Sequence, residues 1–404
     1  MEATPPRALW AGRTLALVGI VLVAFNLRTA VASLSPILGQ VEAEIPLNPA
    51  IVGFLGMLPP ICYAVFGILT PMVAKRFGLE VTLVWSLLAL SAGLLGRGFS
   101  GSALTLVATS TLTFAAMGVA NVLLPPLVKR YFPDRIGLLT TVYVTAMSVS
   151  AFIPPLIAVP IAEAAGWRVS LGEWGLIAAI SLVPWIALLV HPRRQAPAAL
   201  LEEADRGMLR HAVRSPLAWS LALVFAAAGF NAYAAFAWLP SMLHDIAGVA
   251  PAEAGALLSL YAAMGLPAGL IVPVLAARYG KVQLLIVIAI VAFVAGYLGL
   301  LLVPGWATWL WVALIGAGPL LFPLALVLIN LRTRTHSGSV ALSGFVQSVG
   351  YLIVAAGPLV VGLLHDATGG WFWPLVLLLG SALPAAIAGA VVVRPRFFED
   401  ERAR

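Results

Sequence analysis

The chain has 404 residues, of which 62% are hydrophobic and only 10% are charged. Its mean hydropathy of +1.04 excludes an ordinary water-soluble globule, because soluble domains hold about 25% charged residues. The formal charge of +7 comes from short segments between apolar runs, which does not indicate nucleic-acid binding. The single cysteine, Cys62, excludes a disulfide framework and a paired-thiolate metal or redox site.

Apolar runs long enough to cross a bilayer follow one another along the whole chain, since about 20 helical residues span its hydrocarbon core. We predict an all-α membrane protein with twelve transmembrane helices. Their expected bounds are 14–38, 50–74, 81–98, 103–128, 137–162, 173–190, 217–243, 253–277, 282–303, 306–330, 339–364 and 371–393.

The basic residues orient these helices. An even number of spans leaves both termini on one side, and the cations of that side outnumber those of the other, where only Arg97 and Arg168 fall. Cytoplasmic loops carry such an excess. We therefore expect a multi-pass protein of a bacterial-type plasma (inner) membrane with both termini in the cytoplasm. The cations on the expected cytoplasmic side are Arg7, Arg13, Lys75, Arg76, Lys129, Arg130, Arg135, Arg193, Arg194, Arg206, Arg210, Arg214, Arg278, Lys281, Arg332, Arg334, Arg394, Arg396, Arg402 and Arg404.

The second half of the chain repeats features of the first. The matching segments are Phe25-Asn26 with Phe230-Asn231, Pro71 to Gly78 with Pro273 to Gly280, Gly118 to Pro125 with Gly316 to Pro323, and Glu163 to Trp167 with Asp366 to Trp371. We predict two pseudo-symmetric six-helix halves, 1–192 and 216–404, joined by a cytoplasmic linker, 193–215. Parallel repeats of this kind are typical of transporters that bind substrate near the membrane midplane.

The turn after the second span resembles the loop motif G-x-x-x-D-R-x-G-R-K of the major facilitator superfamily. It keeps Arg76 and Gly78, but has Pro71 at the motif's glycine and Lys75 at its aspartate. The resemblance implies the superfamily fold and a gating role for this loop and its repeat. The expected gating residues are Lys75, Arg76, Gly78, Arg278 and Gly280.

Longer motifs resemble the cyanate/2-nitroimidazole transporter family (CynX/NimT) of that superfamily. They are Phe25 to Ala30, Gly118 to Arg130, Phe322 to Leu326, and Gly344 to Trp371. The resemblance covers nearly the whole chain. It implies cyanate, 2-nitroimidazole or similar small planar compounds as the substrate class, and a monomer that moves them by rocker-switch alternating access.

Arg28 is the cation that the sequence places inside the membrane. It lies 15 residues after Arg13 and 14 before Glu42, near mid-depth. A charged side chain there costs about 2.5–3.5 kcal/mol on insertion scales, and all sixteen acids map to loops or span ends. We therefore interpret Arg28 as the anchor of a small anionic or planar polar substrate, whose groups fit the guanidinium fork. The alternative is a structural arginine satisfied by backbone carbonyls.

Other polar or aromatic residues at similar depth are further candidates for substrate contact. In a continuous helix Arg28 and Thr29 share a face while Asn26 points away, so Asn26 and its repeat Asn231 fit helix packing as well as binding. Gln347 and Tyr351 share one face of the eleventh span. The remaining substrate-contact candidates are Tyr63, Asn121, Tyr233 and Tyr261.

The sequence also limits the energetics and the function class. No His, Asp or Glu is expected at mid-depth, so an enzyme, a catalytic residue, a metal site and a cofactor are not predicted. The coupling partner is open: the substrate enters with its proton, exchanges for another anion, or moves by facilitation. The alternative function is export of neutral aromatic compounds such as nitroimidazoles.

Overall fold

The computed structural model describes residues 13–190 and 206–403, and all regular elements in those ranges are helical. Twelve helical segments there are long and apolar enough to cross a membrane, which confirms the predicted number. The helices are α1 (Thr14–Asn26), α2 (Thr29–Ala32), η1 (Ser35–Ile37), α3 (Leu38–Glu42), α4 (Pro49–Phe77), α5 (Leu79–Gly98), α6 (Ala103–Tyr131), α7 (Ile136–Ala165), α8 (Trp167–Gly172), α9 (Trp174–Val190), α10 (Arg206–Arg214), α11 (Pro216–Ala247), α12 (Pro251–Ala263), α13 (Gly265–Ala277), α14 (Val282–Leu302), α15 (Thr308–Ala317), η2 (Gly318–Leu320), α16 (Leu321–Leu331), α17 (His336–Thr368), α18 (Phe372–Gly380), α19 (Ala382–Val392) and η3 (Phe398–Ala403).

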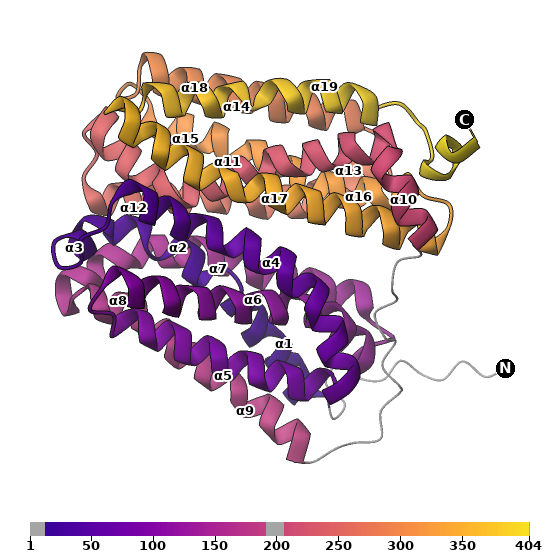
Figure 1. The fold of residues 1–404 in the computed structure, drawn as a ribbon, viewed down its shortest axis with the longest axis horizontal. Helices are drawn as coiled ribbons and strands as arrows, with labels where there is room; N and C mark the ends of the chain where they lie inside the picture. Colours follow the sequence, from indigo (N-terminus) through magenta and orange to yellow (C-terminus); the bar gives the residue numbers. More distant parts are fainter. Residues whose placement is uncertain (1–12, 191–205, 404) are drawn as a thin grey trace.

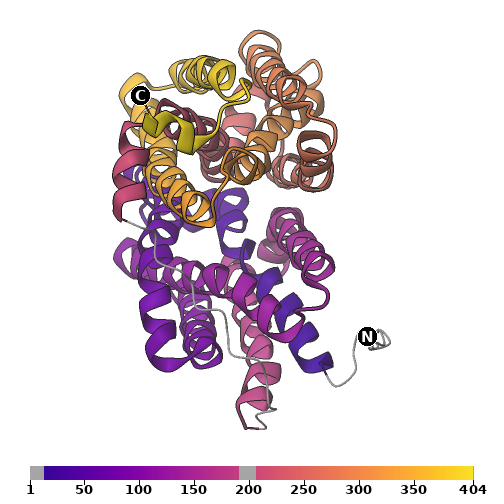
Figure 2. The same ribbon diagram turned by 90° about the vertical axis from the view of Figure 1, so that its right-hand side faces the viewer.

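The helices form two groups that face each other across the middle of the molecule (Figure 1). One group holds α1 to α9, and the other holds α11 to α19. We call the side where α1 begins and α19 ends the terminal face, and the other side the opposite face. Figure 2 looks onto the terminal face. Of the expected linker, residues 193–205 lie outside the described ranges, and the rest includes α10, which packs on α11 and α17.

The sequence repeat reappears in the contacts of equivalent side chains. Asn26 donates through Nδ2 to Ser181 Oγ over 2.9 Å, and Asn231 donates through Nδ2 to Ser381 Oγ over 2.8 Å. Each asparagine thus ties the first span of its half to the sixth. The equivalent loops also share a glycine with positive φ: Gly78 after α4 has φ 88°, and Gly280 after α13 has φ 63°. Positive φ favours glycine, which explains why both loops keep it.

The two halves pack most closely near the opposite face. Gly53, near the start of α4, lies where a Cβ would come 2.9 Å from the carbonyl oxygen of Pro358 in α17. Gly255, near the start of α12, lies where a Cβ would come 2.5 Å from the carbonyl oxygen of Pro155 in α7. Such distances leave no room for a side chain. Glycine therefore allows α4–α17 and α7–α12 to close this end of the interface between the halves.

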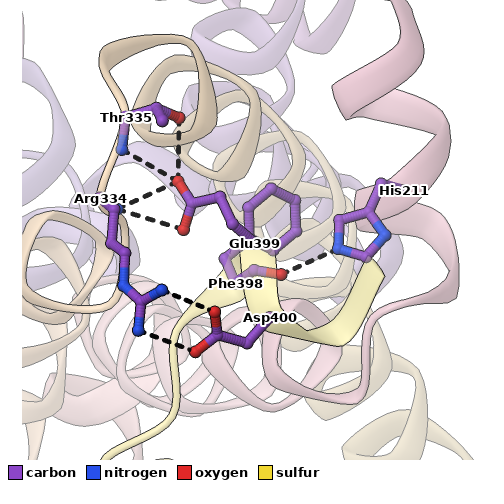
Figure 3. Close-up of polar contacts among 6 residues, drawn as sticks. All are labelled: His211, Arg334, Thr335, Phe398, Glu399 and Asp400. Atoms are coloured by element: carbon purple, nitrogen blue, oxygen red, sulfur yellow. Dashed lines mark hydrogen bonds and ion pairs between the residues drawn. The ribbon is translucent and has the colours of Figure 1, made fainter. Parts of the chain in front are cut away.

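The end of the chain folds back onto the terminal face (Figure 3). Glu399 accepts hydrogen bonds from the backbone N–H groups of Arg334 and Thr335, each over 3.0 Å, at the start of α17. Arg334 makes a two-pronged ion pair with Asp400, over 2.8 and 3.0 Å. The Phe398 carbonyl lies 2.9 Å from His211 Nε2 of α10. These contacts form what we call the C-terminal clasp, which joins η3, α10 and α17.

The clasp is expected to open when Glu399 loses its charge. Burial alone would raise the pKa of Glu399, but hydrogen bonds from Thr335 and Arg334 outweigh it and lower the pKa below its usual value. The stabilisation is therefore fully present above the unfolded value of about 4.3 and is lost as pH falls through the lower folded-state pKa. Glu399→Gln should speed hydrogen exchange of the η3 amides several-fold at neutral pH. Exposed Glu253→Gln is the control, and equal exchange in both variants would contradict the assignment.

Candidate substrate-binding site

The first membrane span is interrupted at Arg28, where the sequence predicted one continuous helix. α1 ends at Asn26, α2 begins at Thr29, and Arg28 between them has φ −130° and ψ −10°. Inside a membrane, a freed backbone group must find another partner. The Leu27 carbonyl accepts from the Tyr63 hydroxyl over 3.2 Å, and the Ala30 carbonyl accepts from Arg97 Nη1 over 3.0 Å. Side chains from α4 and α5 therefore hold the break open.

Arg28 contacts both halves of the molecule. Its Nη1 donates to the Tyr233 hydroxyl of α11 over 2.9 Å, and its guanidinium lies 5.5 Å from the centre of the Tyr63 ring in α4. Tyr63 in turn packs edge-on against Tyr351 of α17, with ring centres 6.2 Å apart. The C-terminal end of α1 and the Tyr63 ring face offset part of the positive charge. No salt bridge of Arg28 occurs within the described ranges.

A cavity of about 630 Å³ extends from Arg28 between the halves. Its wall reaches Thr141, five residues into α7, and Val327, near the end of α16, so it runs toward the terminal face. Of the described residues that line it, Arg28 alone carries a charge. Most of the remaining wall is apolar or aromatic, including Phe225 and Phe322, whose rings lie 5.0 Å apart. The space therefore suits a small ligand with one anionic or electron-rich group and a flat apolar body.

Six of the ten expected substrate-contact residues line this cavity. They are Arg28, Asn121, Tyr233, Tyr261, Gln347 and Tyr351. The Tyr261 hydroxyl is buried and has no hydrogen-bond partner among the described residues, so it can bind a ligand. Gln347 uses its Nε2 to donate to Ser343 over 2.8 Å, so its carbonyl oxygen stays available as an acceptor. The sequence did not single out Thr140 and Thr141, because hydroxyls near a span end carry no distinctive pattern.

The structure places the other four candidates beside the cavity rather than in its wall. Asn26 and Asn231 are fully buried in the asparagine–serine contacts of their own halves. Thr29 is buried and donates to the Asn26 carbonyl over 3.2 Å. Tyr63 supports the guanidinium of Arg28 through its ring and the broken helix through its hydroxyl. These four residues therefore support the residues of the cavity wall without lining the cavity themselves.

The expected gating residues lie at the terminal face, away from the cavity wall. Lys75 and Arg76 occupy the last turn of α4, and Arg278 caps α13. The guanidinium of Arg76 lies 5.3 Å from the Phe77 ring centre, and that of Arg278 lies 5.7 Å from the Tyr279 ring centre. The two loops thus share this arginine–aromatic contact, although one residue separates α4 from α5 and four separate α13 from α14.

The structure buries Arg97, which the sequence placed on the outer side, at the end of the third span. It is only 1% exposed, in the last turn of α5, and its side chain reaches the break in the first span. The interior therefore holds two buried arginine side chains near the break, where the sequence predicted one. Arg97 follows Gly93 and Gly96, whose close contacts with α6 bring the end of α5 inward. That small-residue spacing before an arginine is the signal that could have indicated burial.

Comparison with known proteins fits this geometry. Residues 17–353 match the Major Facilitator Superfamily. The chain belongs to this superfamily. Superfamily members are transporters rather than enzymes, as expected from the sequence, and the twelve helices in two six-helix halves are their fold.

Two relatives confirm the narrower resemblance. The 2-nitroimidazole transporter of Escherichia coli (strain K12) is 33% identical to this chain over 393 residues. The match covers 95% of this chain and 96% of the relative. The cyanate transport protein CynX of the same organism is 24% identical over 389 residues, covering 94% and 96%. An inward-facing, occupied structure of a bacterial homologue of the lysosomal transporter Spinster has a TM-score of 0.73 at 16% identity, covering 98% and 99%, which supports the fold.

Proposed function

We propose that this protein is a secondary or facilitative transporter of a small anionic or planar polar compound, with Arg28 as the substrate anchor. The observation that carries the proposal is that Arg28 is the one charged residue among the described lining of a largely apolar cavity between the halves. An Arg guanidinium offers five donors, and Arg28 uses one of them, to Tyr233. An anionic ligand would occupy donors that are otherwise without a strong acceptor.

Alternating access is the proposed transport mechanism. The close glycine contacts at Gly53 and Gly255 seal the opposite face, while the cavity extends toward the terminal face. Rocking of the halves 1–192 and 216–404 would open the sealed end and close the other. Arg28 and Tyr233 belong to different halves, so a ligand between these side chains would contact both halves.

The proposed location is a bacterial-type plasma membrane with the terminal face in the cytoplasm. The terminal face carries the Arg13–Asp134 and Arg334–Asp400 ion pairs and most of the cations among the described residues. Cytoplasmic segments carry such an excess of Lys and Arg. The described arrangement then corresponds to an inward-facing state, and a monomer that couples transport to a proton or to a counter-anion is the proposed working unit.

A ligand screen tests the proposed function. The purified protein is heated in detergent with cyanate, other small anions, aromatic carboxylates or 2-nitroimidazole, and the melting temperature is recorded. A ligand that binds the folded state raises it by mass action. We expect an anion to stabilise the wild type and to lose this effect in Arg28→Gln. Equal shifts in the two proteins would contradict the anchor role.

Export of a neutral aromatic compound is the second candidate. Tyr143, Phe225, Phe236 and Phe322 give the cavity a wall that could stack on a planar ring. The 33% identical 2-nitroimidazole transporter is named for such a compound. Stabilisation of both the wild type and Arg28→Gln by 2-nitroimidazole, with no effect of anions, would favour this candidate over anion transport.

A further inference from the structure

A second, smaller cavity lies on the other side of Tyr233 from the central one. Val31, Tyr233 and Phe236 line both, so these side chains form the partition between them. The smaller cavity is also lined by Val52 and Leu55 of α4, in the part of the interface that is closed toward the opposite face. Its volume is about 30 Å³. A water needs about 10–15 Å³ on this measure, so the space fits one small ion or two waters.

Three buried polar groups of this small cavity have no hydrogen-bond partner in the part of the chain that the structure describes. They are Arg97 Nε, Ser35 Oγ and Ser110 Oγ. Arg97, Ser35 and Ser110 are 1%, 6% and 0% exposed, so bulk water does not satisfy them. Unpartnered buried polar atoms are uncommon in native proteins, because each carries a desolvation penalty. Three of them around one void indicate that the void is normally occupied.

The charge around the cavity selects the occupant. Arg97 makes one hydrogen bond, to the Ala30 carbonyl, and takes part in no salt bridge within the described ranges. Its guanidinium also lies 5.8 Å from the centre of the Phe114 ring. Arg28 lies at the same broken helix but lines the central cavity rather than this one. A buried guanidinium with no described acid beside it favours an anion over a neutral water as the occupant.

We propose that the small cavity is a second anion site, in which Arg97, Ser35 and Ser110 bind one small monovalent anion. The serine hydroxyls donate hydrogen bonds, and the guanidinium supplies the charge. Because Tyr233 separates this site from Arg28, a rotation of its side chain would connect the two. The further step, in which the transported anion passes between Arg97 and Arg28, rests on the proposed function; anion binding at Arg97 does not.

Bromide titration in an Arg28→Gln background tests the second site without a contribution from the central one. Thermal unfolding of the full chain in detergent is followed while sodium bromide replaces sodium gluconate at constant ionic strength, since gluconate is too large for the cavity. We expect saturable stabilisation by bromide in Arg28→Gln. Adding Ser110→Ala should weaken the apparent affinity about three- to ten-fold through loss of one hydrogen bond, and adding Arg97→Gln should abolish the effect.

Ser110→Ala and Ser35→Ala decide the question if the Arg97→Gln protein does not fold, since both keep the contact between Arg97 and Ala30. If Arg28→Gln does not fold, both serine variants are compared with the wild type. Absence of any saturable bromide effect, or affinities unchanged by both serine substitutions, would overturn the second site and leave water as the occupant. Failure of the proposed function has a different signature: Arg28→Gln would then leave binding of the transported compound unchanged.

Discussion

Replacing Arg28 with glutamine is expected to weaken the binding of a small anion about 10- to 150-fold. This range corresponds to the loss of one charged hydrogen bond, about 1.5–3 kcal/mol. Glutamine keeps one amide donor but is shorter and uncharged, so the change removes both the charge and the donor that reaches Tyr233. Arg28→Lys should recover part of the affinity, because lysine keeps the charge without the planar fork. Isothermal titration with the anion found in the screen measures each dissociation constant.

Arg168→Gln is the matched control for this series. Arg168 is an exposed arginine that pairs with Glu44 outside the cavity, so its removal changes the net charge by the same amount. We expect its anion affinity to stay within two-fold of the wild type. If Arg168→Gln and Arg28→Gln weakened binding equally, the effect would come from overall charge, and the anchor role of Arg28 would be wrong.

Gly255→Val is expected to shift the protein away from the arrangement seen here. A side chain at this position would collide with the Pro155 carbonyl, in the contact that closes the opposite face. Overpacking of this kind costs about 1–3 kcal/mol, which changes a conformational equilibrium about 5- to 150-fold. Only the arrangement in which α7 and α12 touch carries this penalty. The variant should therefore favour a state closed at the terminal face and lose most transport.

Cysteine labelling can follow this shift, because Cys62 is the only native cysteine. In a Cys62→Ala background, Thr141→Cys places a reactive thiol in the cavity wall near the terminal face. We expect Gly255→Val to slow maleimide labelling there several-fold. Gly67→Val, at a membrane-helix glycine with nothing within 4 Å of its Cβ position, should leave the rate unchanged. Unchanged labelling in both would argue against α7–α12 as the closing contact.

The fold could be predicted because it follows from two simple features of the sequence, the long apolar runs and the internal repeat. Apolar runs long enough to span a bilayer predicted the helices. The Phe-Asn repeat predicted the two halves, and the equivalent Asn26–Ser181 and Asn231–Ser381 contacts match this repeat. Arg28 stood out since a lone cation at mid-depth is costly. Its approach to the second half was less evident, although Tyr233, the residue two positions after the repeated asparagine, was among the candidates.

Two features of the site depended on packing and escaped the sequence. The break at Arg28 has no proline or glycine next to it; it exists because Tyr63 and Arg97 bind the carbonyls of Leu27 and Ala30 from other helices. Arg97 itself was expected on the outer side at the end of a span, since position in the sequence predicts the depth of the Cα atom but not the direction of a long side chain. Both errors have one cause: partners that lie far apart in sequence.

Uptake by reconstituted vesicles tests the central claim most directly. Radiolabelled anion, chosen from the binding screen, is presented to proteoliposomes that contain the wild type, Arg28→Gln or Arg168→Gln. We predict saturable uptake by the wild type and by Arg168→Gln, and a loss of at least ten-fold in transport efficiency for Arg28→Gln. Equal uptake by all three proteins would contradict the claim that Arg28 anchors the transported anion at the centre of the path.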